Sequence, residues 1–304
     1  MSKILAVFGA TGIQGGSVVR AILNDNALSS EFKIRAITRD ASKPAAQEFA
    51  AKGVEIVTAD MSSVELVASA VEKAHTVFLV TNFWENFSEE VEISQGKAVT
   101  DACKAAGVQH LIFSSLINTT KASDGRLPNI THFVGKSKIE QYIRDSGVPA
   151  TFVLAGLYMS NLFSMIRKGD NGHYSMAVPV SEKAQFPLFD AAGDTGKFVA
   201  ATMRNYPTCL GKQIYACTKY YTPSEIVSEF SSVLNMPATY VHVPSKVAKS
   251  FFPDVMAQEM LETLLLLDDP GYYEKADLAE SLKLLNEEPT TWKEFVHENE
   301  ANWL

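Results

Sequence analysis

Two hydrophobic periodicities alternate along the first half of the chain. Short apolar runs such as Val-Phe-Leu-Val at 77–80 lack the polar alternation of a strand with one face in water. Such runs are typical of parallel strands that are buried on both sides. Between them, apolar residues recur at helical spacing. The pattern predicts strands at 3–8, 32–38, 54–58, 76–81, 110–114 and 151–155, and helices at 13–25, 42–52, 62–73, 87–106 and 132–146.

Strands that alternate with helices at this spacing indicate stacked βαβ units. The predicted fold class is therefore α/β, a Rossmann-type doubly wound parallel sheet with helices on both faces. Gly53, Gly107 and Gly147 support the predicted helix ends, because each follows a helix and precedes a strand. Glycine is common at that position because it readily adopts the left-handed conformation of a C-cap.

The regular alternation ends near residue 155. Segment 156–195 carries Gly, Pro, Asn and Asp at close intervals, so we expect irregular, loop-rich structure there. One more strand is predicted at 213–218, and Thr222-Pro223-Ser224-Glu225 is typical of a capping box that opens a helix. Helical patterns continue at 245–267 and 290–300. We expect a main domain over 1–155, completed by the strand near 213–218, and a smaller mixed C-terminal lobe over 156–304 with a substrate or partner cleft.

The charge balance narrows the classes of partner. The 304 residues include 27 Lys and Arg against 35 Asp and Glu, a net charge of −8. A nucleic-acid binder or a protein of anionic membranes normally shows a basic stripe, so we expect no direct nucleic-acid binding and no membrane association. No apolar run approaches the ~18 residues of a membrane span, and the first strand is too short for a signal-peptide core. We expect a cytoplasmic protein, with the nucleus as a second compartment, that is a monomer or homodimer.

Cysteine and histidine usage gives no metal or disulfide framework. The chain has three cysteines, an odd number without metal-ligand spacing. Its histidines show no paired metal spacing. We therefore expect neither a metal site nor a disulfide scaffold.

A glycine-rich turn follows the first predicted strand and opens the first helix. Its glycines have the spacing G-x-x-G-x-x-G over 9–15. Glycine permits a tight turn and close approach of a pyrophosphate, and the N–H groups of the helix start face the anion. The alternative is a structural turn of the kind found between any strand and helix. The order of strand, turn and helix favours a dinucleotide site, with contacts from Gly9, Ala10, Thr11, Gly12, Ile13, Gln14 and Gly15.

The end of the second strand selects the cofactor. An NAD site usually places Asp or Glu there, where its carboxylate accepts hydrogen bonds from the ribose. This strand ends in Thr38-Arg39, roughly 30 residues after Gly9, and Lys43 follows. Because a guanidinium binds phosphate with two hydrogen bonds, Arg39 and Lys43 favour NADP(H) over NAD(H). Asp40 keeps NAD(H) open, and solvated surface charges are the alternative explanation for the two cations.

Four segments together resemble a known family. They are Gly-Ala-Thr-Gly-Ile-Gln-Gly-Gly-Ser-Val at 9–18 with Thr38-Arg39, Thr81-Asn82-Phe83-Trp84-Glu85, Gln95-Gly96-Lys97, and His132-Phe133-Val134-Gly135-Lys136. The chain resembles, essentially from end to end, the NmrA-like family of atypical short-chain dehydrogenase/reductases. Members of that family are described as NADP(H) redox sensors and as regulators of nitrogen-metabolite repression.

The resemblance implies roles for further residues. Lys136 would hold the nicotinamide ribose, and Tyr158 and Asn161 would close over the nicotinamide end. A substrate pocket would lie at Trp84, His132 and Tyr158. The remaining cofactor contacts that the resemblance implies are Asp60, Met61, Thr81, Asn82, Phe83 and Lys97.

The tyrosine of the wider superfamily is missing. Active members carry Tyr-x-x-x-Lys, in which two residues four apart share one helix face. Here Lys136 is present but His132 stands at the tyrosine position. If the chain is an enzyme, His132, Lys136 and Ser114, which ends the fifth strand, would be its catalytic residues.

Two functions and a third, structural possibility follow. In the first, the chain binds NADP(H) with low or absent turnover and acts as a redox sensor through a regulatory protein partner. In the second, it is an NADPH-dependent reductase of a small molecule, in which His132 is the acid. Imines, quinones and activated carbonyls are the expected substrates. Imines suit such a site because an iminium accepts hydride without an enzyme acid. In the third, His132 only hydrogen-bonds within the helix packing.

Overall fold

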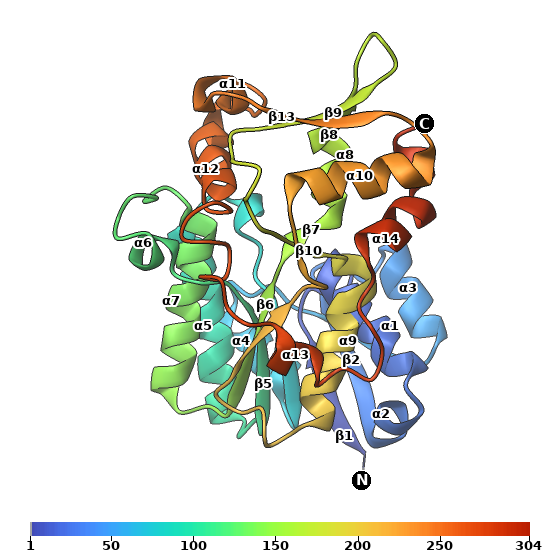
Figure 1. Ribbon diagram of the computed structural model, residues 1–304. Helices are drawn as coiled ribbons and strands as arrows, with labels where there is room; N and C mark the ends of the chain where they lie inside the picture. Colours follow the sequence, from blue (N-terminus) through green and yellow to red (C-terminus); the bar gives the residue numbers. More distant parts are fainter. Residues whose placement is uncertain (1) are drawn as a thin grey trace.

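A seven-stranded parallel sheet lies at the centre of the larger lobe in the computed structural model, which describes residues 2–304 (Figure 1). The strand order is β11-β6-β5-β4-β1-β2-β3, and every neighbouring pair is parallel. The order reverses between β1 and β4, which is the switch point where ligands of such sheets bind. The strands are β1 (Lys3–Val7), β2 (Phe32–Thr38), β3 (Glu55–Thr58), β4 (Thr76–Leu79), β5 (His110–Ser115), β6 (Ala150–Ala155) and β11 (Gln213–Ala216).

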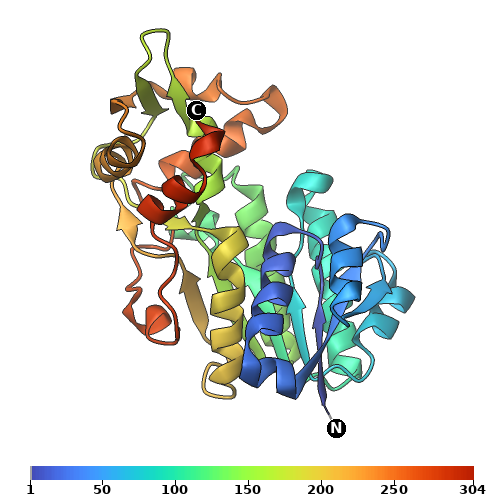
Figure 2. The ribbon, with the colours of Figure 1, turned by 90° about the vertical axis from the view of Figure 1, so that its right-hand side faces the viewer.

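Helices cover both faces of this sheet. On one face α1 packs against α9, and on the other α5 packs against both α4 and α7 (Figures 1 and 2). The strands between them are buried along their whole length in β4, β5 and β6, as their continuous apolar sequences predict. The Rossmann-type fold class is confirmed. The helices are α1 (Ile13–Asn24), α2 (Asn26–Glu31), α3 (Pro44–Ala51), α4 (Val64–Val71), α5 (Glu89–Ala105), α6 (Thr119–Ala122), α7 (Thr131–Ser146) and α9 (Ala191–Arg204), with the 3-10 turn η1 (Phe83–Glu85).

The predicted helix ends are confirmed. Gly53, Gly107 and Gly147 have φ angles of +81°, +66° and +77°, the left-handed conformation that glycine adopts without strain. The capping box at Thr222 and Glu225 also forms, with each side chain bonded to the other residue's backbone N–H. These ends depend on local chemistry, which explains why the sequence predicts them correctly.

Segment 156–195 is more regular than we expected. Four short strands and the start of α9 lie within it, so the expectation of irregular structure is wrong for much of this segment. The strands are only two to five residues long and pair mainly with distant segments, which leaves little periodicity to detect. They form two sheets, β12-β10-β7 and β13-β9-β8. Their bounds are β7 (Leu157–Tyr158), β8 (Ile166–Lys168), β9 (Tyr174–Val178), β10 (Phe186–Phe189), β12 (Tyr220–Tyr221) and β13 (Ala238–His242).

The second lobe lies over the carboxyl ends of the parallel strands (Figure 1). The helical pattern at 245–267 is interrupted in the structure. Pro253 cannot continue a helix, and it separates α11 from α12. Within residues 2–304 none of the helices is long and apolar enough to cross a membrane. The remaining elements are η2 (Met159–Asn161), α8 (Leu162–Met165), α10 (Pro223–Leu234), α11 (Ser245–Lys249), α12 (Asp254–Leu265), α13 (Ala279–Leu282), α14 (Trp292–Glu298) and η3 (Glu300–Asn302).

Helix α9 has no counterpart in the sequence prediction. It begins Ala-Ala-Gly-Asp-Thr-Gly, a composition typical of a loop, yet it packs on α1. The two helices meet at Gly196, whose N–H donates to Ser17 Oγ at 3.0 Å. A Cβ on Gly196 would lie 2.4 Å from the Ala21 Cβ and 2.4 Å from the Ser17 carbonyl oxygen. Glycine here serves close helix contact, and tertiary packing overrides its low helix propensity.

We expect Gly196→Ala to destabilise the protein by about 1–3 kcal/mol, because overpacking at this contact outweighs the helix propensity gained. Urea unfolding followed by circular dichroism measures the change. Gly169→Ala is the control, since its Cβ would meet only the Asn171 side chain at 3.1 Å and the His173 carbonyl oxygen at 3.5 Å. Equal stability of Gly196→Ala and wild type would contradict the close contact.

Candidate functional site

A cavity of about 820 Å³ opens at the carboxyl ends of the parallel strands. The larger lobe contributes the glycine turn, the ends of β2, β4 and β5, and part of α7. The second lobe contributes an apolar wall, largely from α12 and its flanks. The members of that wall are Met165, Phe252, Met256, Met260, Leu264 and Tyr272.

The glycine turn shapes one end of the cavity. Gly9 has a φ of +65°, and the Gly12 N–H donates to its carbonyl oxygen at 2.9 Å. A Cβ on Gly15 would lie 2.3 Å from the same oxygen, so the turn and helix α1 approach too closely for any side chain. No side chain within residues 2–304 caps α1, and its first turn lines the cavity. Its unpaired N–H groups and this cradle fit the pyrophosphate of a dinucleotide.

Four charged side chains, which we call the rim, line the cavity beyond β2, β3 and β4. They are Arg39, Lys43, Asp60 and Glu85. Arg39 forms an ion pair with Glu85, whereas Lys43 has no ion-pair partner among the described residues. Hydrogen bonds from Ser62 hold the pKa of Asp60 below its ordinary value, so this carboxylate stays ionised at neutral pH.

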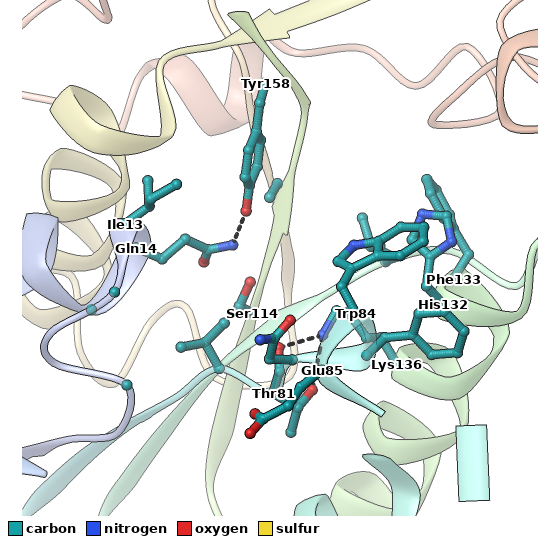
Figure 3. A pocket seen from close by; sticks show the side chains of 18 of the residues that line it. Ile13, Gln14, Thr81, Trp84, Glu85, Ser114, His132, Phe133, Lys136 and Tyr158 are labelled. Atoms are coloured by element: carbon teal, nitrogen blue, oxygen red, sulfur yellow. Dashed lines mark hydrogen bonds between the residues drawn. The ribbon is translucent and has the colours of Figure 1, made fainter. Parts of the chain in front are cut away.

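Lys136 lies on α7, and its ammonium contacts the segment that follows β4. Its Nζ donates to Thr81 O at 3.0 Å and to Thr81 Oγ1 at 2.8 Å (Figure 3). It also donates to Glu92 Oε1 at 2.6 Å. Glu92 is 1% exposed and also accepts from Thr81 Oγ1 at 2.7 Å. A Cβ on Gly135 would lie 2.8 Å from Glu92 Oε2, so the glycine of the His-Phe-Val-Gly-Lys segment makes room for this carboxylate. The lysine charge is therefore paired inside the fold.

His132, at the tyrosine position, contacts a carboxylate from the second lobe. Its Nδ1 lies 2.5 Å from Glu259 Oε1, and its backbone N–H donates to the same oxygen at 2.9 Å. Thr131 Oγ1 donates to Glu259 as well, at 3.1 Å. Glu259 thus caps the amino end of α7 from α12. The ring of Trp84 covers His132, with centroids 4.8 Å apart (Figure 3).

Tyr158 enters the cavity from the side opposite the aromatic pair (Figure 3). Its hydroxyl accepts a hydrogen bond from Gln14 Nε2 at 2.5 Å. Burial raises the pKa of Tyr158, so the phenol stays protonated at neutral pH. Ser114 is 2% exposed and lines the cavity, whereas its neighbour Ser115 donates to Glu140 at 2.6 Å.

The structure brings most of the predicted site residues to this one cavity, and two of them lie elsewhere. Ala10 is fully buried, with its N–H donated to Ile37 O at 3.2 Å. Lys97 is exposed on α5, with its ammonium 5.0 Å from the ring centroid of Tyr142. Neither of these two residues lines the cavity. The predicted residues that line it are Gly9, Thr11, Gly12, Ile13, Gln14, Gly15, Arg39, Lys43, Asp60, Met61, Thr81, Asn82, Phe83, Trp84, Ser114, His132, Lys136, Tyr158 and Asn161.

Sequence reasoning missed the two carboxylates that hold the central side chains. Glu92 carried a detectable signal, since it shares the buried face of α5 with Gly96, Val99 and Cys103 at helical spacing. A carboxylate in such a stripe needs a buried partner. Glu259 carried no such signal, because it lies 127 residues from His132 and only the fold brings them together. Among residues 2–304 there is no cluster of three or more metal-ligating side chains.

The sequence pattern of the NmrA-like family matches residues 1–296. The chain belongs to the NmrA-like family. It is 31% identical over 261 residues to the NmrA-like family domain-containing oxidoreductase malD of Malbranchea aurantiaca, covering 81% of this chain and 77% of that protein. It is 30% identical over 273 residues to the nitrogen metabolite repression protein nmrA of Emericella nidulans, covering 86% and 74%.

Solved structures of NmrA, a negative transcriptional regulator, have the same fold. The complex with NADP has a TM-score of 0.84 and 25% identity, covering 100% of this chain and 98% of NmrA. The complex with NAD has the same TM-score and identity, covering 99% and 98%. This NmrA-like chain therefore has an NAD(P)-binding fold, and its named relatives include both a regulator and oxidoreductases.

The contact between His132 and Glu259 predicts a pH-dependent contribution to stability. Burial raises the pKa of Glu259, but hydrogen bonds from the His132 side chain and backbone and from Thr131 outweigh it, so the pKa lies below its ordinary value. The unfolded chain then takes up a proton before the folded one as the pH falls. The stabilisation is present above the ordinary value of about 4.3 and is lost as the pH falls through the lower folded-state value.

We expect Glu259→Gln to be less stable than wild type by about 1–3 kcal/mol at pH 7, because a charged acceptor is lost. The difference shrinks between about pH 5 and pH 3, which urea unfolding across that range measures. Glu182→Gln, an exposed carboxylate elsewhere in the second lobe, serves as the control. A difference that grew with falling pH would contradict the depressed pKa.

Proposed function

We propose that this NmrA-like protein binds NADP(H) and acts as a redox sensor with low or absent turnover. The glycine turn would hold the pyrophosphate, Arg39 and Lys43 the 2′-phosphate, and Lys136 and Tyr158 the nicotinamide end. When bound, the cofactor supplies a hydride or accepts one. The uncapped start of α1 and the cations of the rim support this assignment, as do the NAD and NADP complexes of NmrA.

The arrangement around Lys136 carries the sensor interpretation. In active relatives of the wider superfamily the lysine charge assists proton transfer by a neighbouring tyrosine. Here the Lys136 ammonium is paired with Glu92, and His132 at the tyrosine position is bonded to Glu259. A protein carboxylate therefore neutralises the Lys136 ammonium, and Glu259 occupies one ring nitrogen of His132. This supports binding without efficient reduction.

Sensing requires that the cofactor bind two conformations with different affinity, since equal affinity shifts no equilibrium. Helix α12 offers a route for such a shift, because Met256 and Met260 line the cavity and Glu259 between them holds α7. A ligand that moves this wall changes the contact between the lobes. In our proposal a protein partner reads that change.

We expect Arg39→Ala to weaken NADPH about 10- to 100-fold and NADH less than about threefold, because a charge-assisted hydrogen bond contributes ~1.5–3 kcal/mol. Isothermal titration calorimetry measures both affinities. Lys33→Ala is the control, as it removes the same charge from the exposed, opposite end of β2. Equal weakening of both cofactors would show that Arg39 does not bind the 2′-phosphate.

A reductase is the second candidate, and the apolar wall of the second lobe favours it. Met165, Phe252 and Met256 give room beside His132 and Trp84 for an uncharged organic molecule. Imines suit such a site because an iminium accepts hydride without a strong acid. Quinones and activated carbonyls are the other classes, and Ser114 or His132 would then donate the proton.

Consumption of NADPH separates the two candidates. We expect tight NADPH binding without consumption above the background rate when imines, quinones and aldehydes are offered. Absorbance at the NADPH band follows the reaction, and single-turnover mixing detects slow transfer. Turnover that is lost in His132→Ala while NADPH affinity is kept would instead support the reductase.

A further inference from the structure

Arg39, the residue proposed to hold the 2′-phosphate, already has an anionic partner. Its Nη1 donates to Glu85 Oε1 across the rim, and both side chains are partly exposed, at 52% and 36%. Glu85 ends the η1 turn that follows β4, so the contact joins two separate segments of the chain. A phosphate binds a guanidinium through two of its N–H groups. Glu85 already accepts a hydrogen bond from one of the terminal nitrogens, Nη1. Glu85 and the phosphate therefore compete for one cation.

The charges of the rim sum to zero in the free protein. Arg39 and Lys43 contribute two positive charges, and Asp60 and Glu85 contribute two negative charges. A 2′-phosphate brings up to two further negative charges into this group. A carboxylate that stays at contact distance weakens the binding of this phosphate, because like charges repel.

Glu85 is the carboxylate that is free to move. Asp60 is held by its own turn, where the backbone N–H of Ser62 donates to Oδ1 at 2.7 Å. Within residues 2–304, Glu85 makes no hydrogen bond other than the one with Arg39. Rotation of its side chain into solvent breaks one partly exposed ion pair, which is a small cost.

We propose that Glu85 is a specificity-determining residue that occupies Arg39 in place of the 2′-phosphate and is released when NADP(H) binds. The inference rests on the proposed cofactor site and goes beyond it. Glu85 lowers the affinity for NADP(H) relative to NAD(H), because the 2′-hydroxyl of NAD(H) does not compete with Glu85 for Arg39. The phosphate thus changes the position of a protein side chain, as a sensor requires.

The release of Glu85 acts on the aromatic cluster beside it. Phe83, Trp84 and Glu85 form the single turn η1. Phe83 is buried at 4% exposure, and Trp84 covers the ring of His132 at 4.8 Å. The ion pair with Arg39 fixes the end of this turn, so its loss frees Trp84 to change its packing on His132. Trp84 lies at the cavity, while Trp292 and Trp303 are buried in the second lobe, which makes Trp84 a local fluorescent reporter.

Calorimetric titration of Glu85→Gln with NADPH and NADH tests the competition. Glutamine keeps a neutral acceptor for Arg39 and removes the charge. We expect NADPH affinity to rise about 3- to 10-fold and NADH affinity to change less than about twofold, in line with a partly exposed pair and one removed like charge. The gain shrinks as salt is raised, because rim charges are screened. Glu90→Gln, an exposed glutamate on α5, is the matched control and stays at wild-type affinity.

A double variant tests whether the effect passes through Arg39. In the Arg39→Ala background, Glu85→Gln should give less than half of the gain in NADPH affinity that it gives in wild type. A gain of the same size in both backgrounds, or weaker NADPH binding by Glu85→Gln, would overturn the inference. Loss of NADPH binding in Arg39→Ala with no effect of Glu85→Gln would overturn it too, yet leave the proposed function standing. Absence of any dinucleotide binding by wild type would instead overturn the proposed function.

Trp84 fluorescence tests the release itself. We expect NADP⁺ to change the emission of wild type more than NAD⁺ does at saturation. We expect free Glu85→Ala, which leaves Arg39 without this acceptor, to shift toward the NADP⁺-bound spectrum. Trp84→Phe identifies the signal by removing it. Identical emission changes with both cofactors, or an unshifted Glu85→Ala spectrum, would overturn the coupling to η1.

Discussion

The unpaired N–H groups at the start of α1 are the constraint around which the cavity is organised. The turn from Gly9 to Gly15 is too tight to admit a side chain, and no residue in the described chain caps the helix. These donors need an acceptor from outside the protein or from water. The strand order places them at the point where β1 and β4 diverge, so the ends of neighbouring strands surround any anion bound there.

Two carboxylates pair with the lysine and the histidine that lie near that point. Glu92 pairs with Lys136 inside the larger lobe, and Glu259 pairs with His132 from the second lobe. Removing one partner of a buried pair leaves the other charge without compensation. The loss of stability is then larger than the stability that the intact pair contributes. The two ion pairs therefore join α5 to α7 and α12 to α7 at the cavity.

Helix α12 is one connection between the second lobe and the site. Besides Glu259, α12 carries Glu262, whose oxygens accept from the Asn129 backbone at 2.7 Å and its side chain at 2.5 Å. Both carboxylates hold the chain at the entry to α7, and the same helix presents Met256 and Met260 to the cavity. A ligand that touches this wall would therefore contact the helix that holds the entry to α7.

The sequence alone determined the parallel sheet, the tight glycine-rich turn, the helix ends at Gly53 and Gly147, and the cations after β2. Each depends on local periodicity, on the conformational freedom of glycine or on charge at a strand end, which neighbouring residues carry. Helix α9 and strands β9 and β10 were not predicted, because their partners α1, β13 and β12 lie far along the chain. The pairings of Glu85 with Arg39 and of Glu259 with His132 were decided by tertiary structure alone. These contacts join residues 46 and 127 positions apart. The first forms because the turn after β4 lies beside the end of β2, and the second because the second lobe packs on the larger one.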